Sequence, residues 1–140
     1  MARSSEGVKK KQYQNLIGQA KKARGRAYAP YSKFKVGAAV LASSGRIYTG
    51  CNVENASYGL TLCAERAAIV RMVAEGEKDI RAVAVVTDRE KPASPCGACR
   101  QVIAEFSPNA EIVMANLRGT ALTENLSRLL PSRFLKANFR

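Results

Sequence analysis

The sequence predicts an α/β fold, a three-layer α/β/α domain with a mixed sheet of about five strands. Stretches with helical spacing alternate with short strands along the chain, in the order α-β-β-α-β-α-β-β-α. The apolar run 80–87 is too continuous for a strand with one wet face, so we expect it centrally in a sheet covered on both sides. Residues 1–140 show no repeat, low-complexity segment or linker, and we expect a single domain.

The first half of the chain predicts one helix and a hairpin. A helix over about residues 8–26 is indicated by apolar residues at helical spacing, namely Tyr13, Leu16, Ile17, Ala20 and Ala23. Pro30 then begins a loop. Residues 34–41 and 46–50 read as two antiparallel strands joined by a turn at 43–45. Small residues in the first strand indicate that a helix packs closely against it.

The second half predicts two further helices before a short final one. The expected elements are a helix over 62–75, a strand over 80–87, a helix over 96–106, a strand over 110–115, a shorter strand over 118–123 and a helix from 123 or 124 to 130. Pro131 ends the last helix.

The formal net charge is +12, from 23 Lys and Arg against 11 Asp and Glu, and it is unevenly distributed. Residues 1–35 hold ten bases against one acid, and residues 117–140 hold five against one. The middle of the chain, 36–116, has eight bases and nine acids. We therefore expect the terminal elements to form a solvated basic surface, with binding of a polyanion such as nucleic acid as the alternative.

Composition also predicts the compartment. No apolar run approaches the ~20 residues that a membrane-spanning helix needs, and the charged N-terminus lacks the apolar core of a secretory signal. The four cysteines form no dense disulfide pattern, which is typical of a reducing compartment. We expect a cytoplasmic protein.

Three of the cysteines stand in two short motifs, Cys63-Ala64-Glu65 and Pro95-Cys96-Gly97-Ala98-Cys99. A Cys-x-x-Cys pair alone is a weak signal, because redox centres and structural zinc sites also use it. Cys-x-Glu, about thirty residues and then Pro-Cys-x-x-Cys is far narrower. That spacing resembles the zinc deaminase signature, in which three His or Cys ligands leave one metal position for water and a Glu moves protons.

The cysteine motifs predict a Zn²⁺ site held by Cys63, Cys96 and Cys99. Each motif stands at an expected helix start, where partial positive charge favours thiolate, and thiolates prefer zinc to magnesium or calcium. The chain has no histidine, and its only other cysteine is Cys51, at the end of a strand. We interpret Cys51 as a small buried residue, with a fourth ligand as the alternative. Three ligands without a fourth indicate an open, catalytic zinc.

Two neighbouring residues complete this centre. Glu65 lies in the first helical turn, where its carboxylate can reach a water in the fourth metal position; a helix-capping acid is the ordinary alternative. Arg66 is three residues after Cys63, so its guanidinium can draw charge from the sulfurs of a site that carries about −1. Arg100 is a lesser candidate for the same role.

Several stretches together identify a family. They are Tyr28-Ala29-Pro30-Tyr31-Ser32-Lys33-Phe34, Gly50-Cys51-Asn52-Val53-Glu54-Asn55, Cys63-Ala64-Glu65-Arg66, Ser94-Pro95-Cys96-Gly97-Ala98-Cys99-Arg100-Gln101-Val102-Ile103 and Leu129-Leu130-Pro131. Through them the chain resembles the small homotetrameric zinc-dependent cytidine deaminases, from Ala27 to about Phe134. The resemblance assigns zinc to the three cysteines, proton transfer to Glu65 and sulfur bonding to Arg66.

The same resemblance implies substrate contacts. Asn52 and Glu54 match a pair that holds the ribose hydroxyls, Phe34 matches an aromatic residue beside the nucleoside, and the Ala64 backbone would face the base. Phe134 matches an aromatic residue that enters a neighbouring subunit's site in a homotetramer.

The implied reaction, in pyrimidine salvage, converts cytidine or 2′-deoxycytidine and water to the uridine nucleoside and ammonia. Glu65 would take a proton from water activated by zinc, deliver it to ring N3 and then protonate the departing amine. Three alternatives stay open: a deaminase of another cytosine nucleoside such as blasticidin S, an editor of cytosine in RNA or DNA, and a non-enzymatic module stabilised by zinc.

Overall fold

The computed structural model describes residues 2–139, with side chains from residue 9 onward, and its elements follow the predicted order. The helices are α1 (Ala2–Arg24), α2 (Ala64–Ala74), α3 (Gly97–Phe106) and α4 (Leu126–Leu129). The strands are β1 (Gly37–Ala42), β2 (Ile47–Cys51), β3 (Ile80–Thr87), β4 (Glu111–Asn116) and β5 (Ala121–Asn125). Two short 3₁₀ helices are η1 (Tyr58–Leu60) and η2 (Lys136–Phe139). None of the described helices is both long and apolar enough to cross a membrane.

The five strands form one mixed sheet in the order β2-β1-β3-β4-β5. β3 and β4 are parallel, and the other neighbouring pairs are antiparallel. β3 lies in the middle, as its continuous apolar run predicted, and only Arg81 among its residues is exposed. The predicted α/β class with a five-stranded mixed sheet is confirmed.

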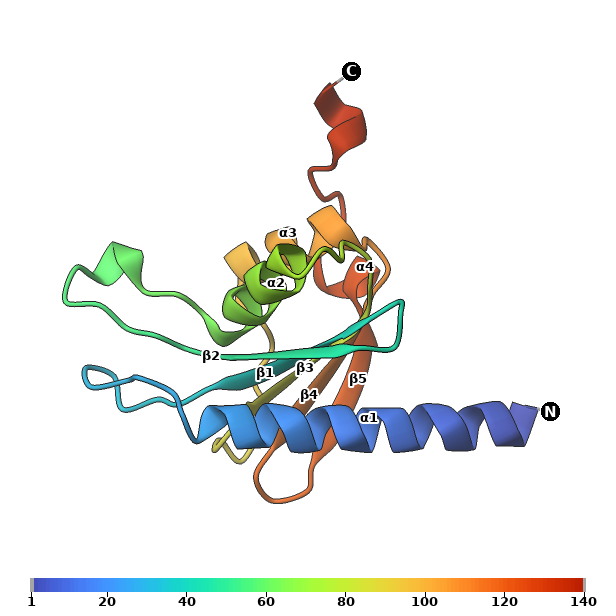
Figure 1. The fold of residues 1–140 in the computed structure, drawn as a ribbon, viewed down its shortest axis with the longest axis horizontal. Helices are drawn as coiled ribbons and strands as arrows, with labels where there is room; N and C mark the ends of the chain where they lie inside the picture. The colour runs from blue at the N-terminus through green and yellow to red at the C-terminus, as the bar shows by residue number, and fades with distance from the viewer. Residues whose placement is uncertain (1, 140) are drawn as a thin grey trace.

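Helices cover both faces of the sheet (Figure 1). α1 lies alone across one face, where Leu16 and Ala20 pack against β1, β3 and β4. α2 and α3 lie on the opposite face, which holds the larger apolar core, including Ile69, Met72 and Ile103. The sheet thus separates the long basic helix from the face that carries the cysteines.

Two glycines allow the helices to approach the sheet closely. A Cβ added at Gly37 would lie 2.0 Å from the Ala20 carbonyl oxygen of α1, and one at Gly50 would lie 2.4 Å from the Ala68 nitrogen of α2. The small residues of the hairpin therefore mark close helix packing, as the sequence predicts, on both sides of the sheet.

Several element boundaries differ from the expected ones, and at two strands the reason is identifiable. α1 begins at Ala2, about six residues before the expected start at residue 8. β1 begins at Gly37 instead of residue 34, because the Asn52 side chain takes the backbone bonds of Phe34 and Val36. β5 begins later than residue 118, because Asn116 Oδ1 accepts two backbone N–H groups and closes a turn at 118–120.

Candidate active site

Three cysteine sulfurs meet where α2 and α3 begin. Cys63 is the N-cap of α2, Cys96 is the N-cap of α3, and Cys99 is buried in the first turn of α3. Their Sγ atoms all lie within 4.8 Å of one another, and those of Cys96 and Cys99 are 3.4 Å apart. Sulfurs at the Zn–S distance of ~2.3 Å in a tetrahedral site are about 3.8 Å apart, so the group fits a zinc ion.

The sulfur group offers three ligands. In the part of the chain that the structure describes, no fourth His, Cys, Asp or Glu joins it. Cys51 lies at the end of β2, outside the group. Both helix starts carry partial positive charge, which favours thiolates at this point. A donor set of three thiolates has the composition of a zinc site that keeps one position for water or substrate.

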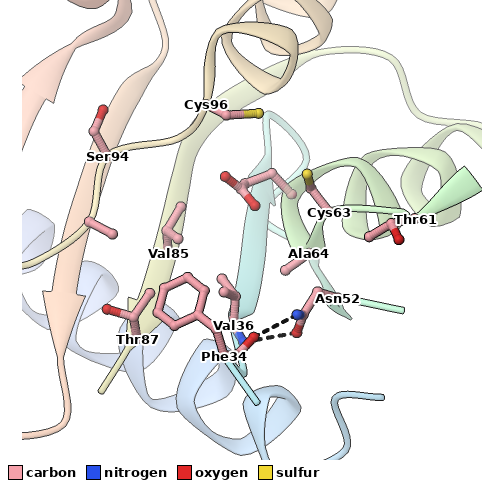
Figure 2. Close-up of a pocket in the computed structure, with 12 residues that line it drawn as sticks. Phe34, Val36, Asn52, Thr61, Cys63, Ala64, Val85, Thr87, Ser94 and Cys96 are labelled. Atoms are coloured by element: carbon pink, nitrogen blue, oxygen red, sulfur yellow. Dashed lines mark hydrogen bonds between the residues drawn. The ribbon is translucent and has the colours of Figure 1, made fainter. Parts of the chain in front are cut away.

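A cavity of about 200 Å³ opens beside the sulfurs, lined by Phe34, Val36, Asn52, Thr61, Cys63, Ala64, Glu65, Val85, Thr87, Ala93, Ser94 and Cys96. Figure 2 shows the sulfurs of Cys63 and Cys96 at one end and Phe34 and Asn52 at the other. Its wall comes from the loop before β1, the end of β2, the starts of α2 and α3 and the end of β3. A small molecule in this cavity would lie against the sulfur group.

Among the described residues, Glu65 is the one carboxylate that lines the cavity, and only 4% of its surface is exposed. Burial, together with the negative charge of the neighbouring Cys63 thiolate, raises the pKa of Glu65 to about 7. The side chain can therefore both accept and release a proton near neutral pH, which is the property required of a general base that later acts as an acid.

Arg66 lies over the first cysteine. Its NH2 atom donates a hydrogen bond to Cys63 Sγ at 3.2 Å. Bonds from Cys99 and Arg66 lower the pKa of the Cys63 thiol to about 5, and the shared proton raises the pKa of Cys99. The positive charge that the sequence places three residues after Cys63 thus directly contacts a ligand sulfur.

Asn52 holds the loop that forms the lower wall of the cavity. Its Nδ2 donates to the Phe34 carbonyl oxygen at 2.8 Å, and its Oδ1 accepts from the Val36 N–H at 2.9 Å (Figure 2). The side chain is almost fully buried, with 8% of its surface exposed, and it lines the cavity. Each of its polar atoms keeps one further hydrogen-bonding position.

Glu54 lies outside the cavity lining and binds the preceding loop. Its carboxylate accepts from the Tyr31 N–H at 2.9 Å, from the Ser32 N–H at 3.1 Å and from the Ser32 hydroxyl. The hydrogen bond from the Ser32 side chain lowers the pKa of Glu54. The structure therefore places Asn52 in the cavity wall and Glu54 behind it, on the same loop.

Phe34 presents its ring to the cavity, and the guanidinium of Arg89 lies over this ring. The guanidinium carbon of Arg89 lies 4.7 Å from the ring centroid, a cation–π contact. Ala64, the first residue of α2, is fully buried in the wall. The predicted residues Phe34, Asn52, Ala64 and Glu65 thus share one cavity with the sulfur group.

Phe134 is outside this cavity, in a C-terminal segment that extends away from the sheet (Figure 1). The residue is 56% exposed, and its ring packs edge-on against Phe139, with centroids 5.3 Å apart. The amide of Gln101 donates to its carbonyl oxygen at 2.6 Å. In this chain Phe134 therefore contributes nothing to the chain's own cavity.

The guanidinium of Arg100 hydrogen-bonds to oxygen atoms and not to the cysteine sulfurs, which were its predicted partners. Its guanidinium donates to Pro95 O at 2.8 Å, to Leu129 O at 2.7 Å and to Ser94 Oγ at 2.7 Å. It ties the loop before α3 to the end of α4.

Five lining residues lacked a signal in the sequence motifs, namely Val36, Thr61, Val85, Thr87 and Ala93. Val85 and Thr87 are on the same side of β3 near its carboxyl end, beside the parallel strand β4. Ligands of open α/β sheets bind at the carboxyl ends of strands, so this rule would have pointed to them.

Comparisons with known proteins agree with this geometry. The family model for the cytidine and deoxycytidylate deaminase zinc-binding region matches residues 10–115, which include all three cysteines of the sulfur group. The chain belongs to this deaminase family. A cytidine deaminase of Sporosarcina psychrophila is 52% identical over 88% of this chain and 91% of its own length. One of Halalkalibacterium halodurans is 50% identical over 86% and 92%.

Solved structures of the deaminase family share the fold. The crystal structure of a cytidine deaminase from Burkholderia pseudomallei superposes with a TM-score of 0.84 at 48% identity, covering 86% of this chain and 98% of the other. A cytidine deaminase from Mycobacterium tuberculosis gives 0.76 at 42% identity, over 87% and 96%. These relatives and the three-thiolate group identify the chain as a deaminase of the zinc-dependent type.

Proposed function

We propose that this deaminase hydrolyses cytidine and 2′-deoxycytidine to uridine and 2′-deoxyuridine, releasing ammonia. The observation that carries the proposal is the buried Glu65 carboxylate in a small cavity whose wall also holds two sulfurs of the three-cysteine group. Relatives about 50% identical over most of both chains are cytidine deaminases, which supports the choice of substrate.

The chain's own residues carry the proton transfers. Cys63, Cys96 and Cys99 would hold the zinc ion, which would supply the Lewis acidity that makes water a nucleophile near neutral pH. Glu65 accepts a proton from the attacking water and delivers it to ring N3 while the new C4–O bond forms. It then takes the remaining proton from the C4 hydroxyl and passes it to the exocyclic amine, so that the C4–N bond breaks, ammonia leaves and the C4 carbonyl forms. Arg66 withdraws charge from the Cys63 sulfur through its hydrogen bond.

Substrate binding is proposed for four residues of the site. Phe34 offers a ring face beside the nucleoside, and the Ala64 backbone faces the base. Asn52 has one free donor and one free acceptor position for a ribose hydroxyl while it holds the loop of Phe34. Glu54 adds to the ribose site, directly or through the Tyr31–Ser32 backbone that it binds.

A homotetramer with sites completed by neighbouring subunits is part of the proposal. The cavity of about 200 Å³ is smaller than the ~300–1,000 Å³ of most small-molecule sites, as expected where one chain supplies only part of the wall. Tyr58 and Leu60 of η1 are 80% and 70% exposed close to the cavity residue Thr61. In such an assembly Phe134 would enter the partner's cavity.

We propose that residues 1–140 act as one domain, because one sheet separates both apolar clusters. We also propose a cytoplasmic role in pyrimidine salvage, with free nucleosides as substrates. A polymer such as RNA is not expected to enter so small a cavity.

The test is ammonia release from cytosine, cytidine, deoxycytidine, blasticidin S and a cytosine-containing RNA, with zinc content measured on the same protein. Turnover of the two nucleosides at one zinc per chain is the expected result. Zinc at full content without ammonia from any substrate would overturn the enzyme assignment. Conversion in RNA or blasticidin S alone would overturn the choice of substrate.

A further inference from the structure

A second group of hollows is lined by residues from the end of α1, from the edge strand β2 and from the last turn of α2. A hollow of about 460 Å³ and an adjoining one of about 170 Å³ share Ala23, Arg26, Thr49 and Arg71. Gln19 and Lys22 line the larger, and Gly50 and Cys51 line the smaller. We call the two together the basic hollow. It shares no lining residue with the deaminase cavity.

Three cations from different parts of the chain converge on the basic hollow. Lys22 and Arg26 come from the end of α1 and just beyond it, and Arg71 comes from the last turn of α2. Among the residues with described side chains, no carboxylate oxygen lies within 4.0 Å of these cationic nitrogens. Two other cations of α1, Lys9 and Arg24, do have acidic partners, Glu111 and Asp88.

Neutralisation by the protein itself is small. Among the side chains that the structure describes, Arg71 Nη1 hydrogen-bonds only to the Thr49 hydroxyl, at 3.4 Å. The α1 carbonyls of Lys22 and Ala23 already accept bonds from Gly25 and Arg26. A helix C-terminus contributes about half a negative charge, so two helix ends offset at most about one of the three positive charges. The basic hollow therefore keeps an excess of positive charge.

This charge and shape fit a phosphorylated ligand. Guanidinium groups match the oxygens of phosphate with paired hydrogen bonds, and a lysine adds a point charge. A phosphate monoester carries a charge of about −1.5 to −2 at neutral pH, which would balance the excess positive charge of the hollow. A single carboxylate carries about half that negative charge. The larger hollow is within the ~300–1,000 Å³ range of small-molecule sites, so it has room for more than a bare ion.

We propose that the basic hollow binds the phosphate group of a small phosphorylated molecule through Lys22, Arg26 and Arg71, with Gln19 and Thr49 as neutral hydrogen-bonding partners. The site is separate from the deaminase cavity and does not depend on deamination. It gives the basic end of α1 a specific ligand instead of a diffuse charged surface.

The test is calorimetric titration of the zinc-loaded full chain at physiological ionic strength. Orthophosphate and adenosine 5′-diphosphate are the probes, and adenosine is the control that lacks phosphate. Both probes should bind saturably, at one site per chain, and adenosine should not. Zinc content measured before and after titration excludes metal removal as the source of heat.

Variants locate the site. R26Q and R71Q each remove one guanidinium and should weaken binding at least about ten-fold, the loss expected for a charged hydrogen bond. K21Q is the matched control, since Lys21 is exposed on α1 outside the hollow. Equal losses in K21Q and R71Q would show charge attraction without a site and overturn the proposal.

Two further results would also overturn it. One is the absence of saturable binding of either probe at millimolar concentration. The other is binding of a single-stranded oligonucleotide by a chain that binds neither small probe, since that would indicate a polymer surface.

Discussion

The side-chain amide of Asn52 lies 2.8 Å from the carbonyl oxygen of Phe34. With the return bond from the Val36 N–H, this residue fixes the loop that carries the aromatic ring of the cavity. One side chain therefore links the end of β2 to the wall of the cavity.

N52A should destabilise the fold and weaken nucleoside binding. The change leaves the Phe34 carbonyl and the Val36 N–H without their partner, a cost of about 1–3 kcal/mol. We expect a lower melting temperature and a KM for cytidine that rises more than kcat falls. N55A is the matched control, because Asn55 only caps its own exposed turn through Ser57. Equal KM values in the two variants would argue against the positioning role.

E65Q should abolish most turnover while zinc remains bound. Glutamine keeps the shape of the buried side chain but carries no exchangeable carboxyl proton, so kcat should fall about a hundred- to ten-thousand-fold. E75Q, on the exposed end of the same helix, should keep normal turnover. Ammonia release within a few-fold of the parent chain, at equal zinc content, would rule out Glu65 as the proton carrier.

C99S and C51S should separate zinc ligands from the remaining cysteine. Cys99 is fully buried in the sulfur group, so its replacement by a hydroxyl should reduce bound zinc well below one per chain. Cys51 is outside the group, so C51S should keep one zinc per chain. Elemental analysis after dialysis measures both. Loss of zinc from C51S would mean that a fourth thiolate closes the site.

R66Q should lower activity without loss of the fold. It removes the donor 3.2 Å from Cys63 Sγ, and loss of such a partner typically costs ten- to a hundred-fold in activity or metal affinity. R66K should recover part of the loss, since it restores the charge but not the planar fork. K78Q, which changes an exposed lysine after α2, is the control. Full activity in R66Q with zinc bound would show that the contact has no catalytic effect.

The hydrogen bonds of Glu54 predict a pH-dependent contribution to stability. Because its pKa in the folded chain is below its ordinary value of 4.5, Glu54 stabilises the fold above that value. The stabilisation is lost as the pH falls through the folded pKa. The melting temperature of E54Q should therefore lie below that of the parent near neutral pH, and the difference should close as the pH falls through the lowered pKa of Glu54. A difference that stays constant over this range would contradict the assignment; both proteins keep the same zinc ligands, so metal loss affects them equally.

The local sequence pattern was sufficient to predict the element order, the central position of residues 80–87 in the sheet and the cysteine group. The element order was predictable because hydrophobic periodicity and turn residues act between neighbours in the chain. The cysteine group was predictable because its three sulfurs come from two short motifs, Cys-x-Glu and Cys-x-x-Cys, each at a helix start. Boundaries were less predictable, because side chains far along the chain decide them: Asn52 displaces the start of β1, and Asn116 delays β5. The role of Arg100 was unpredictable for the same reason, since one of its hydrogen-bond partners is the carbonyl oxygen of Leu129, far along the chain.

The reactive groups of this chain could be predicted from its amino-acid sequence, because a thiolate, a carboxylate and a guanidinium are close together in the sequence at Cys63, Glu65 and Arg66. Which other residues line the cavity beside these side chains is determined by the fold alone. The strand order β2-β1-β3-β4-β5 brings Val85 and Thr87 to Phe34, places Arg89 over the ring and gathers Lys22, Arg26 and Arg71 at the edge strand. These contacts join residues far apart in the chain, and packing of the whole sheet, not local preference, selects them.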